Sequence, residues 1–349
     1  MSRFTRRFFL RASAATTAIA ASQLVNPKLA RTQTKQLNLY SSRHYNTDNE
    51  LYRLFSNQTG IRINLIEGKA DELIERIKSE GANSPADVLI TADAGRLWRA
   101  EQAGIFAPVS SQILSERIPA NLRHQNNLWF GFTKRARVIM YNKGLVNPSQ
   151  LSTYENLADP QWQGKFIVRS SSNIYNQSLV AGLIEIHGEQ KTEAWCRGLV
   201  NNFARSPEGN DTAQIKAVAA GLADLTVANS YYLPRMAKGR NKTAIFDRIG
   251  VFFPNQSDRG THVNVSGGGM VKTAPNPSAA VAFLEFLAGD KAQTFYAQGN
   301  SEYPVVAGVT VDPILAGFGS FKEDITTNVN AYGANSAKAV QIMDRAGWK

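Results

Sequence analysis

The fold is decided by residues 37–102, which read LNLYSSRHYNTDNELYRLFSNQTGIRINLIEGKADELIERIKSEGANSPADVLITADAGRLWRAEQ. Short apolar runs in this stretch alternate with segments whose apolar residues recur at helical spacing. The predicted strands lie at 37–40, 61–66 and 87–91, and the predicted helices at 47–59, 70–80 and 93–102. This order implies an α/β fold in which a mostly parallel sheet carries helices on both faces.

Local signals mark the ends of the first two helices. Thr47 and Glu50 have the spacing of a capping box, in which each side chain bonds to the other residue's backbone N–H. Gly60 and Gly81 follow the last apolar positions, where a left-handed residue commonly ends a helix.

The same alternation begins again in the second half of the chain. The predicted elements there are a strand at 165–168, a helix from Asn173, a helix closed by Gly221 and a strand at 224–228. Two further segments look like crossings between two α/β lobes. Residues 128–142 contain two strand-like runs separated by Lys134 and Arg135, and residues 261–272 contain three consecutive glycines. Long strands with glycine near the middle suit a hinge.

The composition excludes several kinds of protein. The single cysteine, Cys196, rules out an intramolecular disulfide framework and a zinc ribbon. The four histidines lack the spacing of a helix-borne zinc site, and no G-x-S-x-G, Walker or G-x-G-x-x-G motif supports an enzyme. No apolar run reaches the roughly 18 residues of a membrane span. The net charge is +11, but five of these charges fall in residues 1–30, and the rest are scattered without a nucleic-acid footprint.

The N-terminus carries an export signal in its pattern. Arg6 and Arg7 are followed by Phe-Phe-Leu and by a weakly apolar, Ala/Thr-rich stretch from residue 12 to residue 25. This pattern resembles a twin-arginine signal, with cleavage expected near Ala30. The alternative is a basic amphipathic arm.

Polar and aromatic side chains follow three of the predicted strands, where each strand gives way to a helix. They are His44 and Tyr45 after the first strand, Tyr175 after the strand at 165–168, and Tyr231 and Tyr232 after the strand at 224–228. In open α/β sheets, ligands bind outside the carboxyl ends of the strands. These five side chains are therefore expected to face one cleft.

Tyrosines gathered in this way indicate a hard metal ion. The unperturbed pKa of a phenol is about 10, but a trivalent ion supplies the local charge that favours the phenolate. Phenolate is a hard oxygen ligand matched to Fe(III), and imidazole can complete the coordination shell. Arg43 or Arg235 would stabilise phenolates from outside that shell.

A simpler interpretation exists for each residue alone. A tyrosine at a strand-to-helix turn is often a half-buried packing residue. His44 is equally compatible with a surface position. Ser170–Ser172, before a predicted helix, are compatible either with capping or with an anion at the helix N-terminus.

Five segments together resemble the periplasmic ferric-iron-binding proteins of bacterial iron importers, in particular the cyanobacterial iron-uptake type called Fut or Idi. These segments are YSSRHYNTD at 40–48, SSSNIYN at 170–176, PEGNDTAQ at 207–214, ANSYY at 228–232 and GTHVNVSG at 260–267. The likeness extends over nearly the whole chain after the leader.

The resemblance implies a two-lobed periplasmic binding protein of class II type, hinged by crossing strands. One lobe would comprise residues 31–134 and 263–303, and the other residues 135–262 and 304–349. Fe(III) would be held by His44 and Tyr45 from one lobe and by Tyr175, Tyr231 and Tyr232 from the other. The protein would be a monomer in the periplasm, without enzymatic activity, that delivers iron to an inner-membrane ABC importer.

Two other functions fit the same sequence. The fold would also serve an organic solute or an oxyanion bound near Ser170–Ser172. An iron site of this kind would equally serve a protein that sequesters iron for protection.

Overall fold

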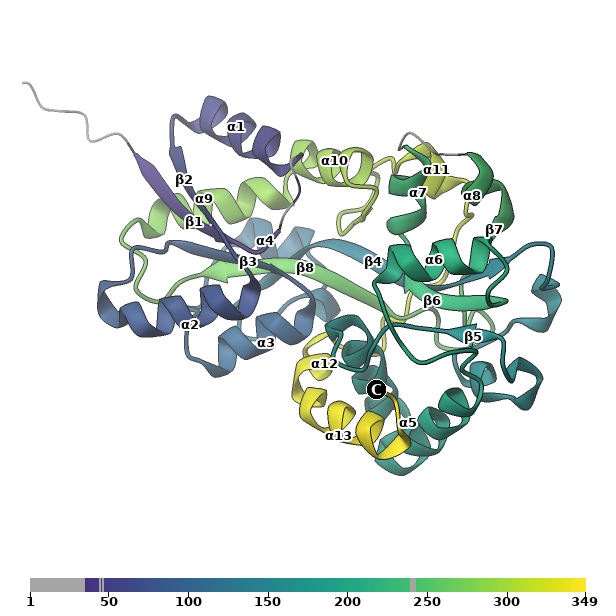
Figure 1. The fold of residues 1–349 in the computed structure, drawn as a ribbon. Coiled ribbons are helices and arrows are strands. Elements are labelled where there is room, and N and C mark those ends of the chain that lie inside the picture. The colour runs from purple at the N-terminus through teal and green to yellow at the C-terminus, as the bar shows by residue number, and fades with distance from the viewer. Residues whose placement is uncertain (1–34, 44, 46, 239–242) are drawn as a thin grey trace, which may run out of the picture. The chain divides into compact units, whose positions relative to one another are not determined.

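The computed structural model describes residues 35–349 except residues 44, 46 and 239–242. The predicted leader at 1–30 lies outside the described residues, and so does His44. The described chain belongs to one compact unit. Helices in this unit pack against the strands of a mixed sheet (Figure 1).

The described residues contain nine strands in one sheet. Their bounds are β1 Gln36–Ser41, β2 Arg62–Glu67, β3 Val88–Ala92, β4 Phe130–Asn142, β5 Phe166–Ile167, β6 Leu225–Asn229, β7 Ile249–Phe252, β8 Val263–Met270 and β9 Tyr303–Pro304. The α-helices of the same residues are α1 Asp48–Thr59, α2 Ala70–Glu80, α3 Ala94–Gln102, α4 Gln112–Arg117, α5 Ile174–Asn201, α6 Asp211–Ala219, α7 Tyr232–Ala237, α8 Thr243–Arg248, α9 Pro277–Ala288, α10 Asp290–Gly299, α11 Pro313–Ala316, α12 Asn330–Ala334 and α13 Ser336–Ala346.

The sheet is mixed, so the prediction of a mostly parallel sheet is wrong. Its main path runs β2-β1-β3-β8-β4-β6-β5, and β7 and β9 both pair with β4. The predicted βαβ units do give parallel pairs, namely β1 with β2 and with β3, and β5 with β6. Every pair that includes β4 or β8 is antiparallel. The crossing strands therefore run against all their neighbours.

The first crossing segment is one strand and not two. Strand β4 continues for 13 residues, and Lys134 and Arg135 lie inside it, paired with β8. The register between the two strands shifts between Gly131 and Thr133. A polar pair therefore does not interrupt the strand, because backbone hydrogen bonds to β8 continue past it.

The glycines of β8 serve close packing. A Cβ atom at Gly269 would lie 2.2 Å from the carbonyl oxygen of Leu128, and one at Gly267 would lie 2.3 Å from that of Phe130. Neither glycine has a positive φ angle. These residues allow two backbones to approach where a side chain would collide.

The end of α1 follows its sequence signal, but the beginning does not. Gly60 ends the helix with a φ angle of 70°, and its N–H donates to the carbonyl of Ser56. Thr47 makes no side-chain cap, so the capping-box prediction is wrong. Its hydroxyl donates instead to Asn300 Oδ1 at 2.5 Å. A partner distant in sequence has replaced the local one.

Strand β4 contributes to two separate hydrophobic clusters. Val138 and Met140 pack into a cluster with α6 and β7, whereas Ile139 belongs to the larger cluster around β1, β3 and α9. Neighbouring residues of a strand point to opposite faces, so one strand supports both cores. The loops after β1 and β6 are thereby held against a rigid sheet.

Candidate metal centre

Four of the five predicted tyrosine and histidine ligands line one cavity of about 340 Å³. They are Tyr45, Tyr175, Tyr231 and Tyr232, and the remaining one, His44, lies outside the described residues. The other side chains of this cavity are Ser42, Arg43, Lys69, Ala70, Asp71, Ala92, Arg96 and Arg235. Three segments distant in sequence thus present phenols to a single space.

The loop between β1 and α1 presents Tyr45. Ser42 holds the loop to the sheet, because its N–H donates to the carbonyl of Ile90 at 2.9 Å and its hydroxyl to Thr91 at 2.9 Å. Arg43 is buried behind the loop, and its backbone N–H donates to the hydroxyl of Ser41. These hydrogen bonds anchor the backbone of the two residues Ser42 and Arg43 in the loop that presents Tyr45.

The other three tyrosines sit at helix beginnings. Tyr175 lies in the first turn of α5, where Asn173 caps the helix by accepting the Tyr175 N–H at 3.1 Å. Tyr231 and Tyr232 follow β6 at the start of α7, and their rings stack with centroids 4.4 Å apart. A helix start lets two adjacent residues face one side, which a strand would prevent.

Five arginines lie over the phenol rings of this cavity. From guanidinium to ring centroid, the distances are 4.7 Å for Arg43 to Tyr45, 4.7 Å for Arg235 to Tyr45, 5.8 Å for Arg235 to Tyr231, and 5.6, 6.0 and 5.6 Å for Arg135, Arg137 and Arg169 to Tyr175. Arg235 therefore connects the Tyr45 loop with α7. Arg43 and Arg235 both lie beside the Tyr45 ring, and their role in stabilising phenolates stays a prediction.

Three buried carboxylates pair with these arginines. Arg43 donates to Asp48 at 2.8 Å and to Glu302 at 2.9 Å. Arg137 pairs with Asp211 at 3.0 Å, and Arg169 lies 3.6 Å from the same carboxylate. Buried charges need such partners, because removing a charge from water without one is costly. Arg43, Arg137 and Arg169 are consequently held in place before any ligand binds.

Three phenols of the cavity, those of Tyr45, Tyr231 and Tyr232, are neutral at neutral pH when no metal is bound. Burial raises the pKa of Tyr231 well above its usual value, and the neighbouring Tyr175 raises it further. Burial also raises the pKa of Tyr232 to about 12. A bound cation of high charge would reverse this preference, since it favours the phenolate.

Sequence reasoning missed several charged residues of this centre. Arg135 and Arg137 come from β4, where they belong to a segment expected only to cross between lobes. Asp211 is the first residue of α6, where Asn210 caps the helix by accepting the Ala213 N–H, and the Asp211 side chain is buried. Charged residues within a predicted buried strand were the available signal, since they are rarely buried unless paired.

Four other polar residues do not line the tyrosine cavity, namely Ser170, Ser172, His187 and His262. Ser170 and Ser172 bond to each other, 3.0 Å between their hydroxyl oxygens, and neither lines the cavity. His187 contacts Glu155 at 2.6 Å, and His262 is buried with its ring 4.5 Å from that of Tyr332. Both histidines therefore make their contacts away from the cavity.

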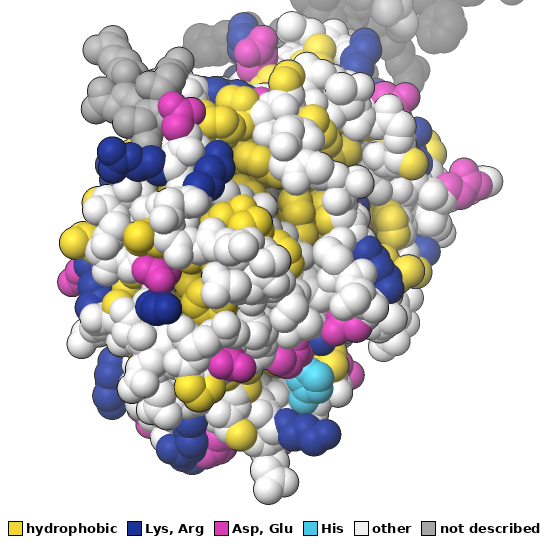
Figure 2. Space-filling model, turned by 90° about the vertical axis from the view of Figure 1, so that its right-hand side faces the viewer, with side chains coloured by type: hydrophobic (Ala, Val, Ile, Leu, Met, Phe, Trp, Pro, Cys, Tyr) yellow, Lys and Arg dark blue, Asp and Glu magenta, His cyan; other side chains and the backbone are white. Residues whose placement is uncertain are grey.

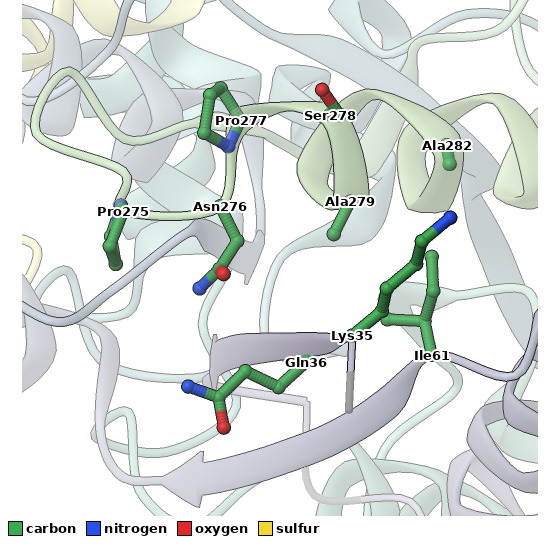
Figure 3. Close-up of a pocket in the computed structure, with 9 residues that line it drawn as sticks. All are labelled: Lys35, Gln36, Ile61, Pro275, Asn276, Pro277, Ser278, Ala279 and Ala282. Atoms are coloured by element: carbon green, nitrogen blue, oxygen red, sulfur yellow. The ribbon is translucent and has the colours of Figure 1, made fainter. Parts of the chain in front are cut away.

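A larger cavity of about 410 Å³ lies between the start of β1 and the N-terminus of α9 (Figure 3). Its lining consists of Lys35, Gln36, Ile61, Pro275, Asn276, Pro277, Ser278, Ala279 and Ala282. Lys35 is the one charged residue among these nine. No tyrosine, histidine or carboxylate of this lining offers a ligand for a hard metal ion. The donors of the tyrosine cavity, unlike those of this larger cavity, suit a hard metal ion.

The surface carries mixed charges. On the face shown in Figure 2, lysine and arginine side chains are scattered among acidic and uncharged ones, without a continuous basic patch. In the part of the chain that the structure describes, no helix has both the length and the apolar character needed to cross a membrane.

Comparison with known proteins gives a consistent result. Residues 50–316 match the family model described as bacterial extracellular solute-binding protein. The chain is 58% identical to iron uptake protein A1 of Synechocystis sp., over 99% of both chains, and 30% identical to the Fe(3+)-binding periplasmic protein of Serratia marcescens, over 88% of this chain and 89% of the relative. A solved Trichodesmium structure, IdiA or FutA in complex with iron and citrate ligands, has 62% identity and a TM-score of 0.88, and covers 90% of this chain and 100% of its own.

The family model covers β2 to α11, and the match to iron uptake protein A1 extends over nearly the whole chain. They confirm the α/β fold of a periplasmic binding protein and the resemblance found in the sequence. The chain belongs to the family of bacterial extracellular solute-binding proteins.

Proposed function

We propose that this protein is a receptor that captures Fe(III) in the periplasm and delivers it to an ABC importer. The observation that carries the proposal is the meeting of four phenols from three separate segments in one cavity surrounded by arginines. Relatives described as iron uptake and Fe(3+)-binding proteins support it.

The proposed ligands are Tyr45, Tyr175, Tyr231 and Tyr232, together with His44 from the same loop as Tyr45. Four phenolates would more than neutralise a trivalent ion, and hard oxygen donors would discriminate against softer divalent ions. The surrounding arginines then favour the resulting negative charge. Each phenol must give up a proton for iron to bind, so loading is expected to release protons.

We place the hinge in β4 and β8, between a lobe of residues 31–134 and 263–303 and a lobe of residues 135–262 and 304–349. Tyr45 then belongs to the first lobe and the other three tyrosines to the second. Iron binding would draw the lobes together, because the coordination shell is complete only when both contribute. The importer would recognise that closed form.

The remaining features of the proposal concern location and assembly. The leader at 1–30, with Arg6 and Arg7, would direct export by the twin-arginine route in the folded state. The mature chain would act as a monomer with an inner-membrane permease as its partner, and it would have no enzymatic activity of its own. Cell fractionation that finds the processed chain on an intracellular face would favour the protective, iron-sequestering function instead.

The decisive experiment loads the purified protein with iron and records its visible spectrum. A phenolate-to-iron charge-transfer band is expected, and Tyr231→Phe and Tyr232→Phe should each weaken or shift it. Tyr332→Phe is a matched control, because the Tyr332 hydroxyl is buried without a hydrogen-bond partner among the described residues and does not line the cavity. A colourless protein that stays iron-free at neutral pH would refute the proposal.

The second candidate ligand is an organic anion. We propose that it would bind together with iron in the tyrosine cavity, and not near Ser170–Ser172, which do not line that cavity. Guanidinium groups bind carboxylates well, and the Trichodesmium structure is described with citrate as well as iron. Loading with ferric salt in the presence and absence of citrate, followed by metal analysis and mass spectrometry of the bound fraction, separates iron alone from an iron–carboxylate complex.

A further inference from the structure

The charges around the phenols do not balance. Five arginines face the rings of Tyr45, Tyr175 and Tyr231. Only three carboxylates pair with these arginines, namely Asp48, Asp211 and Glu302. The layer next to the phenols therefore carries excess positive charge, which favours a negatively charged ferric centre.

Glu302 occupies a special place in this layer. Its side chain is fully buried, with one oxygen 2.9 Å from Arg43 and the other 3.7 Å from Arg135. Arg43 lies over Tyr45 and Arg135 over Tyr175. One carboxylate thus neutralises arginines beside phenols of two different segments.

Only one of the two carboxylate oxygens of Glu302 accepts a hydrogen bond from the described residues. Its Oε1 makes no hydrogen bond to any described residue, and Arg135 instead donates to Ser266 Oγ at 2.6 Å and to the Val265 carbonyl at 2.7 Å. Arg43 keeps a second carboxylate in Asp48. Both guanidiniums would therefore stay anchored if Glu302 lost its charge.

We infer that Glu302 limits how tightly the cavity holds Fe(III), because its charge cancels part of the positive charge that Arg43 and Arg135 present to bound phenolates. The inference rests on the proposed function. By limiting the affinity, the Glu302 carboxylate would make the release of Fe(III) to the importer easier.

The test replaces Glu302 with its neutral isostere. Glu302→Gln keeps the shape of the side chain and an oxygen that can accept from Arg43. At fixed neutral pH, competition with citrate should show Fe(III) held roughly tenfold more tightly, the order expected for removing one elementary charge from a neighbouring layer. Transfer of iron to excess citrate should slow in proportion. Unchanged or weaker binding by a folded variant overturns the inference.

The control and the second variant come from the same neighbourhood. Glu323→Gln is the control. The Glu323 carboxylate lies 2.5 Å from the ammonium of Lys134, the residue before Arg135, and does not pair with the arginines over the phenols. Its replacement should leave iron binding unchanged. Asp48→Asn removes one charge from the other side of Arg43 and should also tighten binding. If Glu302→Gln does not fold, the Asp48→Asn result decides.

The wild-type spectrum separates the two ideas. If wild-type protein shows no charge-transfer band, the proposed function fails. If the wild type binds iron and neither Glu302→Gln nor Asp48→Asn binds it more tightly, the inference on Glu302 fails alone.

Discussion

Replacing Tyr232 with phenylalanine removes one of the four phenols that the proposed iron site would ionise. Burial first, and then the charges of Tyr175 and Asp211, raise the pKa of Tyr232 to about 12. One pKa unit corresponds to about 1.4 kcal/mol, so ionising this phenol at about pH 7 costs about 7 kcal/mol. The bound metal ion must supply that free energy. Each phenolate ligand therefore couples iron binding to the release of one proton.

The sign of the pH dependence follows directly. Iron-free protein holds protonated phenols and iron-loaded protein holds phenolates, so acidification favours the iron-free form. For each phenolate in the bound state, the apparent affinity for iron should fall about tenfold when the pH falls by one unit. Tyr232→Phe should lower the overall affinity and also make its pH dependence shallower by about one decade per unit.

Proton release can be counted in weakly buffered solution with a pH indicator. Ferric citrate is added to the iron-free wild type, to Tyr232→Phe and to the Tyr332→Phe control. The proton balance of the citrate donor is the same in all three and cancels in the comparison. Tyr232→Phe should release about one proton fewer than the other two. Equal proton release from Tyr232→Phe and the wild type would show that Tyr232 does not bind iron as a phenolate.

Three further outcomes are expected. Arg235→Gln should weaken iron binding by roughly tenfold and shift the charge-transfer band, since this guanidinium lies 4.7 Å from the ring centroid of Tyr45; an unchanged titration would argue against its role. Burial lowers the pKa of His262 to about 3, so below about pH 6.5 the unfolded state binds a proton that the folded state does not bind. Between pH 6.5 and pH 5, the free energy of unfolding of the wild type in urea should therefore fall by about 1.6 kcal/mol because of this residue, and that of His262→Gln should fall by less. Gly269→Ala should destabilise the fold by at least about 2 kcal/mol in thermal or urea unfolding, because its Cβ would lie 2.2 Å from the Leu128 carbonyl oxygen, and wild-type stability of that variant would disprove the steric argument.

Local sequence patterns determined most helices and strands. Asn173 at the start of α5 and Gly60 at the end of α1 act through backbone atoms within a few residues, so their effect is readable from the chain alone. The position of Tyr175 and Tyr231 where a helix begins after a strand was readable for the same reason. The family resemblance added which of these residues belong to one ligand set.

Only the tertiary structure decided the direction of the crossing strands and the partners of buried charges. Strands β4 and β8 pair with elements far away in sequence, and no local pattern records their antiparallel direction. Thr47 bonds to Asn300 instead of capping its own helix, and Arg43 pairs with Glu302, 259 residues away. Hydrogen bonds and ion pairs depend on distance in space, so the arginine layer around the phenols exists only once the chain has folded.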